Sequence, residues 1–361
     1  MSLNGYKKLL RPILFRFDAE RVHEWAKVAL RQEPLWRWLG RSCRVDDPRL
    51  QVQLGGLRVP NPVGLSAGFD KDCEVLAGLQ HLGFGYLVPG SVMPHTRQGN
   101  PKDRPRILRL PEQESMLNCL GLPSQGLAYA VEQLKRFRHS SAGQTPIIVN
   151  FGANTLDEYL ACYEALQPLA DAIEVNLRCP NARDDEGDFL RPRMYERLLT
   201  ELIQRKQKPL FIKLQTASSR QEEEERLDLV QRGVYYGIDG YTIPGTWSVK
   251  DDRLSIGRGN LTGRAVFEKT LETVRALWDA TDGKVAIKAR GGIFSGEDAF
   301  RAIAAGASSV DLLTAFIYEG WHVAREINLD LLRRLNEEGI PDLTALRGSA
   351  VQTKWKPAAH E

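Results

Sequence analysis

The chain has 361 residues, of which 42% are hydrophobic and 26% are charged, an ordinary composition for a globular protein. The formal net charge of +3 is too small to indicate nucleic-acid binding. The sequence contains no run of about 18 apolar residues, which a membrane-spanning helix would require. The five cysteines lack CxxC spacing and the six histidines lack HxH or HExxH pairing. The sequence therefore predicts a reducing compartment, and neither a disulfide framework nor a metal site.

Residues 1–44 differ from the rest of the chain in charge and pattern. They hold ten basic and four acidic residues, so this segment carries +6 while the remainder sums to −3. Large apolar residues recur at helical spacing, and Asp18 is a suitable N-cap for the second helix. A basic amphipathic helix pair with tryptophans is typical of a membrane-surface element. A helical cover packed on the main domain, with a solvated basic face, is the alternative.

From about Gln51 short apolar runs alternate with helical stretches. Eight such βα units with near-continuous apolar strands predict a parallel (β/α)8 TIM barrel rather than an open sheet. The predicted strands are Val63–Ala67, Tyr86–Gly90, Ile147–Phe151, Ala172–Leu177, Leu210–Leu214, Gly240–Ile243, Val285–Ala289 and Val310–Thr314.

Three further segments complete the expected organisation. A hairpin around Gly55-Gly56 would close the bottom of the barrel. The insert Met93–Ser124 is too polar and proline-rich for one crossover helix, and it contains a predicted strand, Ile107–Leu110. We expect a helical segment over 1–44, a barrel over 45–340, and a polar, loosely held tail over 341–361.

Functional groups of such barrels gather at the carboxyl ends of the strands. The residues at the predicted strand ends include two lysines, several side-chain amides and glycine turns. Gly291-Gly292, followed by a helix from Ser295, would offer free backbone N–H groups to a phosphate. There is no GxGxxG before a helix and no GxxxxGK[ST], so a Rossmann site or a P-loop is not expected.

The stretch 172–181, AIEVNLRCPN, changes abruptly from an apolar strand to polar residues. Pro180 should end the strand and place Cys179 on a loop between Asn176 and Asn181. A thiol there could shuttle a proton, and the amides could hold a planar polar substrate. A buried structural cysteine beside turn-forming asparagines explains these ten residues equally well.

Several motifs together resemble the dihydroorotate dehydrogenases, which are FMN-containing barrel enzymes. They are GLSAGFDKDCE (64–74), GFGYLVPGSVMP (83–94), GNPKDRPRILRL (99–110), NLRCPN (176–181), FIKL (211–214), LTGRAV (261–266), RGGIFSGEDA (290–299) and AAGASSVDLLTAFIYEG (304–320). The resemblance runs in order over roughly residues 7 to 335. The N-terminal LLRPILFRFDAERVHEWA is similar to the extension of the membrane-associated class, which passes electrons to quinone.

The resemblance implies a role for each matching position. Cys179 takes the place of the catalytic base, which would remove the C5 proton of dihydroorotate while hydride leaves C6 for flavin N5; a second acceptor would then reoxidise the flavin. His23 and Arg109 match positions that line the quinone channel. Substrate-binding positions are Lys71, Asn118, Asn176, Asn181 and Thr246. Cofactor-binding positions are Ala67, Gly68, Lys71, Ser91, Asn150, Asn176, Lys213, Gly263, Gly292 and Thr314.

This chain also departs from the family pattern. The quinone-linked class usually has a serine base, whereas Cys179 is typical of the soluble class. Arg178 stands where serine is usual, and Gly245 stands where an asparagine usually binds substrate. Pro123 and Ser124 replace the asparagines at the end of the family's ring-binding segment. Changing the groups that bind a polar ring should change which ligand is bound, or weaken its binding.

Three functions therefore compete at this stage. The first is oxidation of dihydroorotate in de novo pyrimidine synthesis, with FMN and a quinone, by a cytoplasmic enzyme bound peripherally to the inner membrane. The second is a paralogue acting on another cyclic or unsaturated substrate, favoured by Arg178 and Gly245. The third is a non-catalytic barrel that binds flavin or a partner, and such a scaffold would have no need to keep Cys179, Lys71 and Lys213 together.

Overall fold

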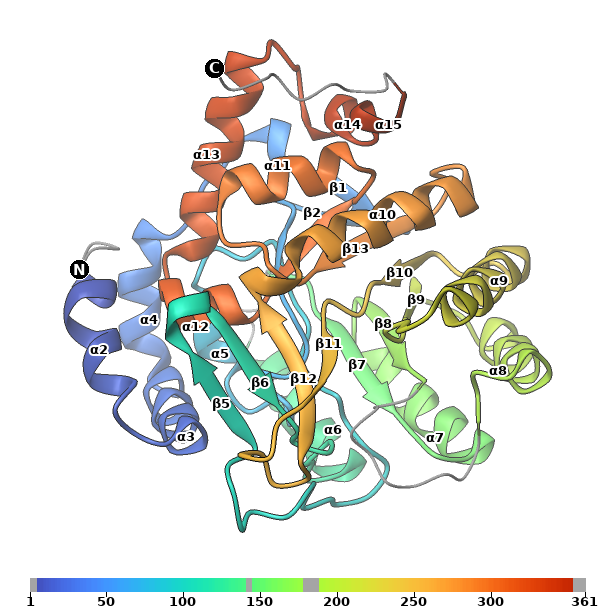
Figure 1. Cartoon of the computed structure of the whole chain (residues 1–361), viewed down its shortest axis with the longest axis horizontal. Coiled ribbons are helices and arrows are strands. Elements are labelled where there is room, and N and C mark those ends of the chain that lie inside the picture. Colours follow the sequence, from blue (N-terminus) through green and yellow to red (C-terminus); the bar gives the residue numbers. More distant parts are fainter. Residues whose placement is uncertain (1–4, 141–144, 178–187, 353–361) are drawn as a thin grey trace.

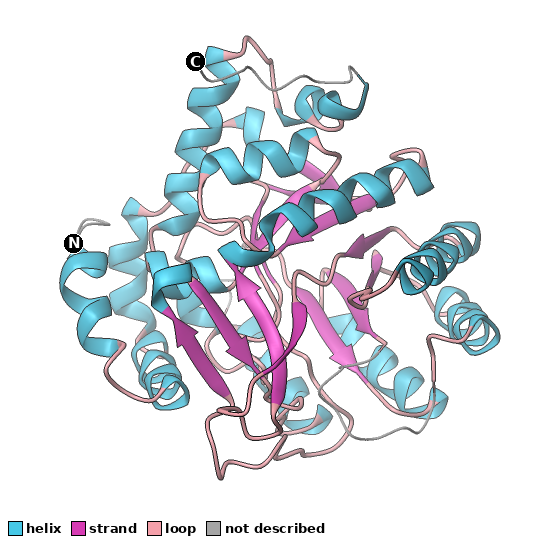
Figure 2. Cartoon of the chain, viewed as in Figure 1, coloured by secondary structure: helices cyan, strands magenta, loops and turns pink. Residues whose placement is uncertain are grey.

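The computed structural model describes residues 5–140, 145–177 and 188–352. Eight parallel strands lie in the order β4-β3-β14-β13-β10-β9-β8-β7. Parallel bridges from Leu87 to Ile147 and from Val92 to Phe151 join the two ends of this sheet into a barrel (Figures 1 and 2). The predicted (β/α)8 barrel and its eight strands are confirmed. The strands are β3 (Val63–Leu65), β4 (Tyr86–Leu87), β7 (Ile148–Gly152), β8 (Ala172–Asn176), β9 (Leu210–Lys213), β10 (Gly240–Thr242), β13 (Ala286–Arg290) and β14 (Ser309–Leu312).

Helices surround the barrel because each has one apolar face (Figure 2). In α7 (Leu156–Leu166) the buried residues Tyr159, Cys162, Tyr163 and Leu166 follow helical spacing, and Thr155 with Glu158 forms a capping box at its start. The other outer helices are α6 (Leu127–His139), α8 (Pro192–Gln204), α9 (Arg220–Tyr236), α10 (Phe267–Thr281), α11 (Gly296–Ala304) and α13 (Val323–Glu337). The expected hairpin is β1 (Val52–Leu54) with β2 (Leu57–Val59), and Leu54 and Val59 are buried in the lower barrel interior.

The N-terminal helices pack against one side of the barrel (Figure 1). They are α2 (Arg11–Leu14), α3 (Ala19–Leu30) and α4 (Glu33–Leu39). The predicted cap of α3 is confirmed, since Asp18 Oδ1 accepts a hydrogen bond from Arg21 N at 2.9 Å. Glu20 of α3 forms an ion pair with the buried Arg106, with Nε–Oε1 at 2.9 Å. The segment is thereby held to the insert that follows β4.

A second, antiparallel sheet is built from two distant parts of the chain. Its order is β11-β12-β6-β5, with β5 (Ile107–Leu110), β6 (Ser115–Asn118), β11 (Trp247–Lys250) and β12 (Arg258–Gly263). Strand β5 was predicted, whereas β6, β11 and β12 were not. Their residues are few and mixed in polarity, and they pair only because the insert after β4 lies beside the insert after β10 (Figure 1).

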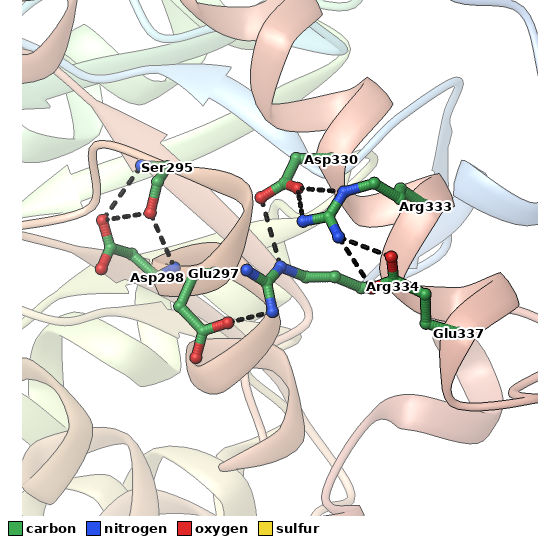
Figure 3. Close-up of polar contacts among 7 residues, drawn as sticks. All are labelled: Ser295, Glu297, Asp298, Asp330, Arg333, Arg334 and Glu337. Carbon is green, nitrogen blue, oxygen red and sulfur yellow. Dashed lines mark hydrogen bonds and ion pairs between the residues drawn. The ribbon is translucent and has the colours of Figure 1, made fainter. Parts of the chain in front are cut away.

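The prediction of a loosely held tail is wrong for the residues just after 342. Helix α14 (Leu343–Leu346) buries Leu343 and Leu346, and the Arg347 guanidinium donates to Val285 O at 2.7 Å. This part packs on α11. Helix α11 is in turn tied to α13 by the ion pair of Glu297 with Arg334, which also pairs with Asp330 of its own helix, beside the Ser295–Asp298 capping box of α11 (Figure 3).

A buried polar network fills the middle of the barrel. Lys288 of β13 has no exposed side-chain surface, and its Nζ lies 2.7 Å from Glu174 Oε2 and 3.4 Å from Asp311 Oδ2. Thr242 and Asn150 donate to Glu174, and Tyr86 donates to Asp311. Burial opposes the ionisation of Glu174, but the charges of Lys288 and Lys213 outweigh it and lower the pKa of Glu174 to about 2. Burial raises the pKa of Asp311 even beside Lys288.

Replacing Lys288 by Met should destabilise the fold by about 3–5 kcal/mol, because two buried carboxylates lose the cation that they share. Chemical denaturation of the two proteins measures this difference. The matched control is Lys284→Met, since Lys284 makes an exposed ion pair with Asp282 and should be dispensable. A Lys288→Met protein as stable as the Lys284→Met control would contradict this assignment.

Candidate active site

A cavity of about 240 Å³ lies between the carboxyl ends of the barrel strands, the antiparallel sheet and helix α3. The barrel contributes backbone or side chains of Ala67, Gly68, Lys71, Ser91, Asn176, Lys213 and Thr246; the sheet contributes Ile107, Met116, Asn118, Asn260 and Thr262; helix α3 contributes Glu20, His23 and Glu24. Three parts of the chain that are far apart in sequence thus form one chamber.

Two buried asparagines at this end of the barrel have side-chain carbonyl oxygens that lack hydrogen-bond partners among the described residues. Asn150 donates its Nδ2–H to Glu174 Oε1 at 2.7 Å, and Asn176 donates to Ser91 Oγ at 3.2 Å. Among the described residues, neither Oδ1 atom has a hydrogen-bond partner. Because a buried carbonyl without a partner is costly, the pair indicates a bound group that donates hydrogen bonds.

Cations line the same chamber. Burial lowers the pKa of Lys71, and the charge of Lys27 lowers it further. Lys213 and Arg290 come from the upper ends of β9 and β13, and both line the cavity. These positive groups suit a ligand that carries or acquires negative charge.

The phosphate site expected beside Gly291-Gly292 has fewer free backbone N–H groups than predicted. The N–H groups of Phe294 and Ser295 at the start of α11 already donate to Asp298 Oδ2, at 2.9 Å and 3.0 Å. The capping box therefore already uses the N–H groups of Phe294, Ser295 and Asp298. A narrow recess remains before it, lined by Gly291, Gly292 and Thr314. Gly292 has φ +78° and lies against Phe267, so a side chain could not fit there.

His23 forms the wall between the barrel and the N-terminal helices. Its ring packs edge-on against Phe69, with the ring centroids 4.9 Å apart. Burial lowers the pKa of His23 to about 3, and the charges of Lys71 and Lys27 act in the same direction. The imidazole is therefore neutral at physiological pH and can serve as a hydrogen-bonding but uncharged wall.

Most of the site residues expected from the sequence are brought together, but not all. Asn150 lies one layer below the cavity, and Gly263 and Arg109 are outside its lining. Arg109 donates to Phe17 O at 2.7 Å and stacks over Phe15, so it braces the N-terminal segment. Cys179, Asn181 and Arg178 lie outside the described residues, and their proposed roles stay predictions.

The changed substrate positions are also accounted for. Pro123 lines the cavity. Ser124 lies outside the cavity lining, and its hydroxyl donates to Asp72 Oδ1 at 3.1 Å. Thr246 borders the cavity, with its hydroxyl 3.2 Å from that of Thr216. Gly245 lies directly against Arg290.

Three buried charged residues in the barrel, Glu174, Lys288 and Arg290, were not predicted from the sequence. The signal was present, since each is a charged residue within or at the end of an otherwise apolar strand. Charged residues are rarely buried unless they are paired or bind a ligand. Side chains at positions i, i+2 and i+4 of a strand share a face, so Ala286, Lys288 and Arg290 all point into the barrel.

Comparison with known proteins identifies the family. A model described as dihydroorotate dehydrogenase matches residues 49–335. The chain belongs to the dihydroorotate dehydrogenase family. A relative from Roseiflexus sp. (strain RS-1), named dihydroorotate dehydrogenase (quinone), is 36% identical over 95% of this chain and 98% of its own length. One of the same name from Gloeobacter violaceus is 34% identical with the same coverage. The crystal structure of the Eimeria tenella enzyme with ferulenol has a TM-score of 0.78 and 26% identity, covering 93% of this chain and 96% of that one.

Membership of this family implies a flavin cofactor, and the chamber fits one. The free Oδ1 of Asn176, which lines the chamber, can accept a hydrogen bond from a flavin ring, and the cations can compensate its polar oxygens. A Cβ added at Gly68 would meet only Leu313, at 3.6 Å, so a flat ring can approach the backbone there.

Proposed function

We propose that this protein binds FMN and oxidises dihydroorotate to orotate, delivering the electrons to a quinone. The observation that carries the proposal is the single chamber lined on one side by Lys71, Asn118 and Asn176 and on the other by His23 of α3. A flavin between these walls would be within reach of a polar substrate and of an acceptor that enters past α3. The names of relatives that match nearly the whole chain support the same reaction.

The chain's own residues would divide the work as follows. The bound flavin would supply an acceptor for the hydride from C6 of the substrate. Cys179 would take the C5 proton, Lys71 would compensate the substrate's negative charge, and Asn118, Asn176, Asn181 and Thr246 would orient the ring. Ala67, Gly68, Ser91, Asn150 and Lys213 would hold the flavin ring, while Gly263, Gly292 and Thr314 would hold its ribityl phosphate.

The purified protein should be yellow and release one FMN per chain on heat denaturation. Anaerobic mixing with a panel of reductants, dihydroorotate first, should bleach the flavin with dihydroorotate, and a soluble quinone should restore the colour. Recovery of FAD, or no flavin after reconstitution, would refute the cofactor assignment. Bleaching by another ring compound but not by dihydroorotate would instead favour the paralogue.

Replacing Cys179 by Ala should leave FMN bound and slow flavin reduction by about 10²–10⁴, the usual contribution of a positioned general base. Cys179→Ser should keep some activity and shift the pH optimum upward, because a hydroxyl is harder to deprotonate than a thiol. The measurement is the rate of bleaching against pH for the three proteins. The matched control is Cys162→Ala, since Cys162 is buried on α7 away from the cavity. A Cys179→Ala enzyme that bleaches at the parent rate would make Cys179 structural.

We also propose that residues 1–44 dock at an anionic membrane surface and admit quinone, at the cytoplasmic face of the inner membrane. Seven of the eleven large hydrophobic residues that are exposed in the described chain lie between residues 9 and 38. They are Leu9, Ile13, Phe17, Trp25, Val28, Leu35 and Trp38. Solvent-exposed patches of this kind, next to basic residues, favour an interfacial location. No helix in the described ranges has the length and apolarity to cross a membrane.

Replacing Leu9 and Trp38 together by Ser should weaken co-sedimentation with anionic vesicles at least about tenfold, since each side chain contributes about 1.5–3 kcal/mol when buried in lipid. Added salt should weaken binding of the parent protein further. Tyr235→Ser is the control, because Tyr235 is 87% exposed but lies on α9. Unchanged vesicle binding and quinone reduction in the double variant would overturn the proposal.

The paralogue remains the second candidate for one structural reason. Gly245 supplies no amide to the site, and Arg290 lies against it and lines the cavity. The reductant panel described above separates the two candidates directly.

A further inference from the structure

Arg290 is a buried cation with no polar partner in the described parts of the chain. Its exposed fraction is 9%, and no carboxylate or carbonyl there lies within ion-pair or hydrogen-bond distance of its guanidinium. Each of the other buried cations of the described chain has a carboxylate partner. Lys288 pairs with Glu174, Arg106 with Glu20, and Arg226 with Glu223. Of these four cations, only Arg290 lines the main cavity and the recess at Gly292.

Leaving a guanidinium buried without partners is costly, and arginine cannot escape the cost by losing its proton. Burial does lower the pKa of Arg290, while Asp311 and Glu174 raise it from a distance. Those two carboxylates lie in the barrel below, already bound to Lys288, Thr242, Asn150 and Tyr86. The guanidinium is therefore available to a ligand in the cavity above them.

The neighbouring Gly245 allows this placement. A Cβ at Gly245 would lie 2.3 Å from Arg290 O and 2.6 Å from Arg290 Cγ. Gly245 also has φ +58°, a conformation that side chains rarely adopt. Any larger residue at 245 would collide with the backbone and the side chain of residue 290, so Arg290 can take this place only beside a glycine.

We propose that Arg290 is a flavin-ring cation that acts with Lys213 to favour the reduced flavin over the oxidised one. This inference rests on the proposed FMN-dependent function. Accepting a hydride adds one negative charge to the flavin ring, and a fixed cation beneath the ring stabilises that charge in a site with little water. Arg290 points toward the barrel axis, as Lys288 does two residues earlier, whereas the Gly292 recess lies beyond the strand end. Although Arg290 also borders that recess, its direction toward the barrel axis favours the ring over the phosphate as its target.

Arg290→Leu should lower the preference for reduced over oxidised FMN at least about tenfold, which for a two-electron couple is a fall in midpoint potential of about 30 mV. Anaerobic titration with a reference dye measures the potential, and fluorescence titration of the apoprotein measures the FMN dissociation constant. Arg290→Lys keeps the charge and should retain most of the parent potential. Arg226→Leu removes another buried arginine outside the cavity lining and should leave the potential unchanged.

The outcomes separate this inference from the proposed function. A parent protein that binds no FMN refutes the function itself. Arg290→Leu with bound FMN at the parent potential overturns the inference, as does weaker FMN binding that affects both redox states equally, because that result assigns Arg290 to the phosphate. If Arg290→Leu does not fold, Arg290→Gln keeps polarity without charge and is judged by the same potential.

Discussion

Lys288 can remain charged at the centre of the barrel only because Glu174 and Asp311 reach it from β8 and β14. The ammonium group also lies over the rings of Tyr86 and Phe211, with Nζ 5.4 Å and 5.5 Å from their centroids. These contacts join β4, β8, β9, β13 and β14 through a layer of the barrel in which apolar side chains usually pack. A buried ion pair of this kind contributes orientation more reliably than stability.

The network sets the geometry of the layer above it. Glu174 takes one Nδ2–H of Asn150, so that the carbonyl oxygen of Asn150 is the atom left for a ligand. The charge of Lys213, which belongs to the upper layer with Asn176 and Arg290, also lowers the pKa of Glu174. The floor of the site is thus organised from below by Glu174 and Lys288, which lie outside the cavity lining.

The roof of the site has a different origin. It is the antiparallel sheet formed by the inserts after β4 and β10, closed on one side by α3. The ion pair of Glu20 with Arg106 and the hydrogen bond from Arg109 to Phe17 O hold the N-terminal helices against this sheet. The cavity accordingly joins a polar barrel floor, suited to flavin and substrate, to an α3 wall whose only imidazole is kept neutral by burial.

The sequence by itself determined the barrel, because eight apolar strands separated by amphipathic helices are visible as local patterns. It also identified the family, and with it most of the polar barrel residues that line the cavity, but few of the residues that the antiparallel sheet contributes. The tertiary structure alone decided how the charged residues within those strands are used. Glu174, Lys288 and Asp311 are 114 and 23 positions apart in sequence and meet only when the sheet closes. The antiparallel sheet and the packing of Leu343 and Leu346 likewise depend on partners far along the chain, which no local pattern specifies.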